Sequence, residues 1–132
     1  MQKNLPRLTP SEFEIMSVIW NNGEMTVTDI MNAVNEKSVK QFARSTIQVQ
    51  VQRLEEKGWL NHRIESKKFL IFANVPRETA SKSIVKDVKQ RIFNGKCSEL
   101  IKSLFGNNIK ISSDEIKKIR SIIDKYEENS NE

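Results

Sequence analysis

The residues best suited to chemistry lie in a basic stretch in the middle of the chain. Between Lys40 and Lys68, seven basic side chains stand against three acidic ones, a local charge of +4. Ammonium and guanidinium groups attract phosphates, and glutamine amides can bond the edges of DNA bases. The whole chain is also basic, with a net charge of +5. This charge favours a polyanionic partner but does not indicate the fold.

Other kinds of chemistry lack the residues that they need. The single cysteine, Cys97, cannot form a disulfide within the chain, and with the single histidine, His62, it cannot complete a zinc site. Neither residue belongs to a nucleophile and base arrangement. We therefore expect no enzyme activity, no metal and no cofactor. Because no apolar run approaches the roughly 20 residues of a membrane helix and no secretory signal is recognisable, we expect a cytoplasmic protein without membrane insertion.

The elements that must position the basic stretch are predicted to be mainly α-helical, with a small β-hairpin. The 132 residues fit one domain, or one small domain with an appendage, and include only 4 glycines and 3 prolines. Capping boxes predict helix starts at Thr9 and Thr26. The first helix is expected over about 10–21, and a short second helix before the polar stretch 35–38.

The next segment is ambiguous by periodicity alone. Residues 47–52 alternate like a strand, yet Ile47, Val51 and Leu54 also have helical spacing. The flanks favour a helix over about 45–57, because Ser45 or Thr46 can cap its start and Gly58 suits its end. Two β-rich runs, 59–65 and 69–73, then predict a hairpin with its connection at 66–68.

Beyond Pro76, three further helical patterns carry apolar faces, the last opened by a capping box at Ser112. A C-terminal region of this size cannot bury these apolar faces within one chain. We therefore predict that a second chain buries them. The alternative is that the helices fold back on the first domain. The residues expected in the interface between chains are Ile84, Val88, Leu100, Leu104, Ile116, Ile119 and Ile123.

Three helices followed by a hairpin form the layout of a winged helix-turn-helix domain. The segments Ala43-Arg-Ser-Thr-Ile47, Arg53-Leu-Glu-Glu-Lys-Gly-Trp-Leu60 and Leu8-Thr-Pro-Ser-Glu-Phe-Glu-Ile-Met16 resemble the BlaI/MecI (penicillinase repressor) family of bacterial transcription factors. The likeness covers nearly the whole chain. It implies a winged-helix DNA-binding domain at residues 1–75, a helical dimerisation region at residues 76–132, and a homodimeric repressor that reads a palindromic double-stranded DNA operator.

The third helix is expected in the major groove of DNA, because its apolar side faces the core and leaves the other side outward. The predicted contacts on this helix are Arg44, Ser45, Thr46, Gln48, Val49, Gln52 and Arg53. Two further groups of side chains are predicted to contact phosphates. They are Lys67 and Lys68 on the hairpin, and Thr26 and Thr28 at the start of the second helix. The alternatives are a solvated face for the glutamines and a capping role for the threonines, which is compatible with phosphate contact.

The resemblance also implies a switch. In penicillinase repressors, derepression involves cleavage within the short C-terminal helix by, or downstream of, a membrane sensor protease. The matching stretch here is 101–105, with Ser103 and Leu104 at the cleavage site, where the family's resistance repressors have an Asn-Phe pair. The competing hypothesis for the whole chain is a winged-helix protein–protein assembly module without specific DNA binding, and the basic charge of the third helix and hairpin favours DNA.

Overall fold

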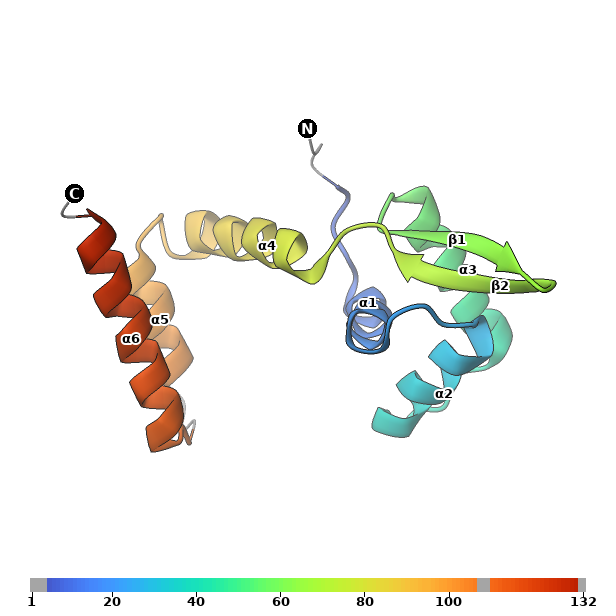
Figure 1. Ribbon diagram of the computed structural model, residues 1–132, viewed down its shortest axis with the longest axis horizontal. Coiled ribbons are helices and arrows are strands. Elements are labelled where there is room, and N and C mark those ends of the chain that lie inside the picture. The colour runs from blue at the N-terminus through green and yellow to red at the C-terminus, as the bar shows by residue number, and fades with distance from the viewer. Residues whose placement is uncertain (1–4, 107–109, 131–132) are drawn as a thin grey trace. The chain divides into compact units, whose positions relative to one another are not determined.

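Three helices and a hairpin come first along the chain, and three more helices follow (Figure 1). They are seen in a computed structural model, which describes residues 5–106 and 110–130. The mainly α-helical fold with one hairpin is confirmed. In chain order the elements are α1 (Pro10–Asn22), α2 (Val27–Lys37), α3 (Arg44–Glu56), β1 (Leu60–Glu65), β2 (Lys68–Ala73), α4 (Arg77–Ile92), α5 (Cys97–Phe105) and α6 (Ser113–Ser130).

Capping boxes begin the first two helices, as the sequence predicts. The Thr9 hydroxyl accepts a bond from the Glu12 amide at 3.2 Å, and the Glu12 carboxylate accepts one from the Thr9 amide at 2.8 Å. Thr26 and Asp29 repeat this reciprocal pattern at the start of α2. Each box satisfies backbone N–H groups that the first helical turn leaves unpaired. The predicted helix starts at Thr9 and Thr26 are therefore confirmed.

The start of α3 differs from the prediction that Ser45 or Thr46 caps it. The helix begins at Arg44 after Ala43, whose side chain makes no capping bond. The turn before it is held by Asn35 at the end of α2, whose amide oxygen accepts from the Phe42 N–H at 2.8 Å and whose amide nitrogen donates to the Phe42 carbonyl at 3.0 Å. This side chain fixes the connection from the α2 end, so the local capping signal at Ser45 is overridden.

The hairpin is antiparallel, with Leu60 opposite Ala73 and Glu65 opposite Lys68. Its turn has two residues, Ser66 and Lys67, both with positive φ (50° and 67°), so the connection is one residue shorter than the predicted 66–68. Positive φ at both positions is what a tight type I′ connection between twisted strands requires. On the other edge of β2, Ile71 exchanges two backbone hydrogen bonds with Met25, at 2.7 and 3.0 Å.

One apolar core holds α1, α2, α3 and the hairpin together. Its most deeply buried side chains are Ile15, Met16, Ile19, Ile30, Ile47 and Leu54. Trp20 and Trp59, which the sequence places in the core, do pack there, and each indole N–H donates to a backbone carbonyl at 2.9 Å. Packing continues past residue 75 into the first turns of α4, through Ala80 and Ile84.

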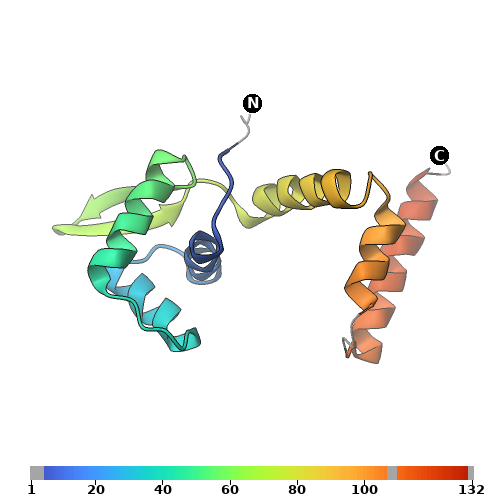
Figure 2. The same cartoon turned by 180° about the vertical axis from the view of Figure 1, so that it is seen from behind.

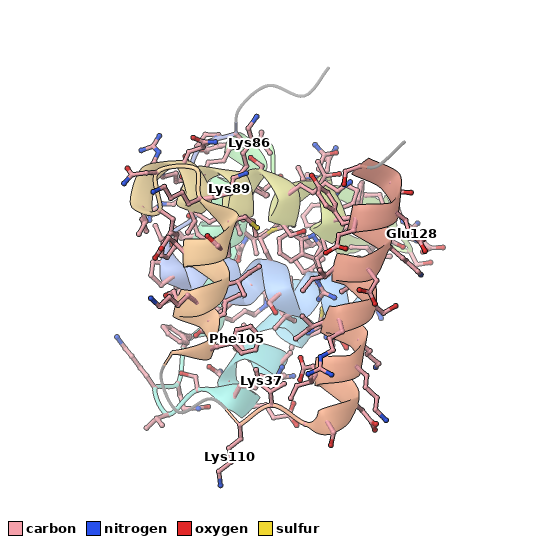
Figure 3. All side chains as sticks on the ribbon, turned by 90° about the vertical axis from the view of Figure 1, so that its left-hand side faces the viewer. Lys37, Lys86, Lys89, Phe105, Lys110 and Glu128 are labelled. Atoms are coloured by element: carbon pink, nitrogen blue, oxygen red, sulfur yellow. The ribbon has the colours of Figure 1, made fainter. Side chains whose placement is uncertain are left out.

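The chain divides into two compact units, the first ending at Ile84 and the second beginning at Val85. In the second unit α5 and α6 run in opposite directions, as the places of Phe105 and Glu128 near the ends of these helices show (Figure 3). Neither helix has a buried residue. Leu104, Ile122 and Tyr126 are each more than half exposed. No helix in the described part of the chain has the length and apolar character that a membrane crossing requires.

Glu12 is a buried carboxylate in the first unit, and its charge is balanced from α3. The Lys57 ammonium donates to Glu12 Oε1 at 2.7 Å, and the Glu12 side chain is only 4% exposed. Burial alone would raise the pKa of Glu12, but the hydrogen bonds from Lys57 and the Thr9 amide, with the Lys57 charge, lower it below its ordinary value. This contact joins the start of α1 to the end of α3.

We expect the change Glu12→Gln to destabilise the protein at neutral pH by about 1–3 kcal/mol, because it removes hydrogen bonds to a charged group. A lowered folded-state pKa gives stability that is present above the unfolded-state value of about 4.3 and lost as the pH falls through the folded value. Urea unfolding of the wild type and the variant across this pH range should therefore show a gap between their free energies of unfolding that closes in acid. Glu14→Gln, at an exposed position of the same helix, is the control, and a gap independent of pH would contradict the assignment.

Candidate nucleic-acid interface

The third helix has one buried side and one open side. Ile47, Val51 and Leu54 enter the core, because residues at these spacings share one face of a helix. Gln50 is half-buried at the margin of this face. Figure 2 shows α3 in front of the hairpin. The side chains predicted to contact DNA are all exposed: Arg44, Ser45, Thr46, Gln48, Val49, Gln52 and Arg53.

A small hydrogen-bond network joins the start of α2 to the open side of α3. Arg44 Nε donates to Thr28 Oγ1 at 3.2 Å, and Arg44 Nη1 donates to Gln48 Oε1 at 3.4 Å. All three residues are exposed. In the described part of the chain, no carboxylate lies within ion-pair distance of Arg44. Its positive charge therefore remains available to an anionic partner.

Thr26 and Thr28 lie at the start of α2 with different surroundings. The Thr26 hydroxyl oxygen accepts from the Asp29 amide at 3.1 Å and is engaged as a cap. The Thr28 hydroxyl oxygen accepts from Arg44 instead. A hydroxyl that accepts one bond still has a proton to donate, so each threonine retains a donor that can meet a phosphate oxygen.

The turn of the hairpin presents two lysines. Lys67 occupies the left-handed region at φ 67°, and Lys68 begins β2. Both side chains are exposed, and neither forms an ion pair with the described residues. Beside them, Ile64 and Phe69 face each other across the strands and are 64% and 56% exposed. The hairpin tip thus carries free positive charge at its turn and apolar side chains behind it.

Arg63, counted in the basic stretch, has its charge compensated. Its Nε and Nη2 donate to the two Glu24 carboxylate oxygens at 2.6 and 2.9 Å, and Glu65 lies 3.0 Å from Nη2. The hydrogen bonds that Arg63 donates to the Glu24 carboxylate lower the pKa of Glu24 and raise the pKa of Arg63. Sequence analysis missed this pairing, because Glu24 and Arg63 are 39 residues apart. The pair ties β1 to the loop between α1 and α2.

Lys57 and His62 are also engaged within the protein. Lys57 holds Glu12, and His62 Nδ1 lies 2.7 Å from Glu55 Oε1. The paired cations of the basic stretch therefore sit where they stabilise the contacts between elements. The cations of the basic stretch without an ion pair to the described residues lie just before α3, on α3 and at the hairpin turn: Lys40, Arg44, Arg53, Lys67 and Lys68.

A three-helix core, a third helix with an exposed polar side and a basic hairpin beside it define a winged helix-turn-helix DNA-binding protein. The family model of the penicillinase repressors matches residues 8–125, so the chain belongs to that family. Its members are transcriptional repressors. Both the fold and the family expected from the sequence are therefore confirmed.

Two relatives among the known repressors match over nearly their whole length. The penicillinase repressor of Bacillus licheniformis is 24% identical over 130 residues, 98% of this chain and 99% of the relative. The methicillin resistance regulatory protein MecI of Staphylococcus aureus is 22% identical over 125 residues, 95% of this chain and 99% of MecI. The solution structure of monomeric B. licheniformis BlaI in complex with the blaP half-operator aligns with a TM-score of 0.50 and 28% identity, covering 59% of this chain and 93% of that one.

Proposed function

We propose that the protein is a homodimeric transcriptional repressor that reads a palindromic operator, with α3 in the major groove and the hairpin turn on the phosphates. The observation that carries this proposal is the open side of α3, which bears polar and basic side chains, none of them paired with a carboxylate among the residues that the structure describes. The complex of the related BlaI with a half-operator supports it. The proposed division is a DNA-binding domain at residues 1–75 and a dimerisation region at residues 76–132.

Each group of candidate residues has its own role in this proposal. Gln48, Gln52 and Val49 lie where they can meet base edges and the thymine methyl group, and Ser45, Thr46 and Arg53 extend the same side of α3. Lys67 and Lys68 contact phosphates, which position the domain without reading sequence. Thr26 and Thr28 add phosphate contacts from the start of α2.

The double change Lys67→Ala/Lys68→Ala should weaken binding to selected and random duplexes alike. It should also reduce the slope of log affinity against log salt by up to about 2, because two phosphate contacts are lost. Gel shifts at several salt concentrations measure both effects. Lys117→Ala/Lys118→Ala, an exposed adjacent lysine pair on α6, removes the same charge elsewhere and should leave the slope nearly unchanged. A changed sequence preference with an unchanged slope would contradict phosphate contact by the turn.

The apolar faces of the second unit support a homodimer. Ile116 and Ile123 are 38% and 46% exposed on α6, and Leu104 is 57% exposed on α5. Val88, Leu100 and Ile119 are half-buried. Ile84 differs from the other predicted interface residues, because it belongs to the first unit and packs against the core there. Exposed apolar helix faces of this kind usually mark a protein interface. A second copy of the chain would bury these faces symmetrically.

We expect Ile123→Glu to convert the dimer into a monomer, because it places a charge in the buried interface while touching no core residue of the single chain. Sedimentation at micromolar concentration measures the state, and Lys125→Glu, at an exposed position on the same helix, is the control. Operator affinity should fall about 10²- to 10⁴-fold, since two linked half-site contacts become separate ones. A wild-type monomer, or a dimer that survives the change, would contradict this interface.

We further propose that a sensor protease inactivates the repressor by cutting α5 between Ser103 and Leu104. Both residues are exposed, and the cut leaves the core of the first unit intact, because that core ends at Ile84. Protein recovered from cells during induction should then contain, by mass spectrometry, a fragment that ends at Ser103. Intact chains during operator release would instead indicate a bound ligand or another signal.

A further inference from the structure

Arg44 contacts Gln48 on the open side of α3, and the consequence of this contact for base reading rests on the proposed function. The two residues lie four positions apart on α3 and therefore share one side of the helix. Arg44 is itself fixed from α2, because its Nε donates to Thr28 Oγ1 at 3.2 Å. Its Nη1 donates to Gln48 Oε1 at 3.4 Å. The glutamine amide is thereby oriented before any DNA arrives.

A free glutamine side chain can pair with adenine through two hydrogen bonds, one donated and one accepted. The accepting atom is Oε1, which would take a proton from the adenine N6 amino group. Here Oε1 already accepts from Arg44. An amino group that approached this oxygen would also meet the positive guanidinium. Adenine and cytosine, which both present an amino donor in the major groove, are therefore disfavoured at this point.

The same arrangement leaves several hydrogen-bond donors of Arg44 and Gln48 without a partner within the described part of the protein. Two of the five guanidinium N–H groups are used within the protein. The remaining guanidinium donors and the Gln48 Nε2 amino group lie on the exposed side of α3. Guanine is the base that presents two acceptors, N7 and O6, and no donor at its major-groove edge. We propose that Arg44 and Gln48 act together as a guanine reader, with Gln48 as a base contact and Arg44 also as its positioning residue.

Selection of binding sites from randomised duplexes tests this proposal with the full-length protein. The wild type should enrich a guanine in each half-site, and replacement of that guanine by adenine should weaken binding about 5- to 150-fold. Gln48→Ala should weaken the preference for guanine at this position alone, because the Arg44 donors remain. Arg44→Ala should weaken binding to all sequences and admit adenine at the same position, because the amide is released. Both side chains are exposed, so the variants should fold, and circular dichroism of each variant checks this.

Lys40→Ala is the matched control, because Lys40 is an exposed cation just before α3 whose Nζ lies over the Phe42 ring, 5.7 Å from its centroid. It should lower affinity without altering base preference. Two outcomes would overturn the proposal that Arg44 and Gln48 read guanine. The wild type could select adenine at the position that depends on Gln48, or Arg44→Ala could keep the wild-type base preference. Either outcome leaves the proposed repressor function intact. If the wild type enriches no sequence at all, the proposed function fails and the reader with it.

Discussion

The burial of one side of α3 is the constraint on which the rest of the structure depends. Ile47, Val51 and Leu54 are each at most 3% exposed, and burying such side chains contributes about 1.5–3 kcal/mol apiece. Their spacing fixes the rotation of the helix about its own axis, because a helix can turn only one stripe toward the core. The residues on the opposite side must then point outward. The same three side chains that stabilise the domain therefore decide which residues can meet DNA.

Charge on the first unit falls into two groups with different consequences. Lys57 and Arg63 are compensated by Glu12, Glu24 and Glu65, so they hold elements together and add little to the outward field. The Arg63 contact acts together with the backbone pair between Met25 and Ile71, and both tie the hairpin to the loop before α2. The hairpin turn thus has a defined place without using its own lysines. A count of basic residues along the sequence overstates the charge available to phosphates, because it cannot tell these groups apart.

Features that depend on neighbours in sequence were predictable, and those that depend on distant partners were not. The starts at Thr9 and Thr26 follow from donors and acceptors three residues apart. The start of α3 depends instead on Asn35 reaching Phe42, seven residues away, and the Arg63 pairing crosses 39 residues. For the interface, helical spacing alone indicated which residues of α3 would be exposed. Which base each side chain reads stays a prediction, because contacts between side chains of different helices, as between Arg44 and Thr28, leave no periodic signal.

The placement of the core also separates two tasks along the chain. Every residue of the core and its margin lies at or before Ile84, while exposed apolar side chains gather beyond it. The first unit can therefore keep its packing by itself, since all the described residues of its core cluster belong to that unit. Under the proposed function, association of two chains then changes operator affinity through linkage of two half-site contacts. Control of that linkage then needs no rearrangement inside the winged domain. The conformation of α3 can stay the same whether the two chains are associated or separate.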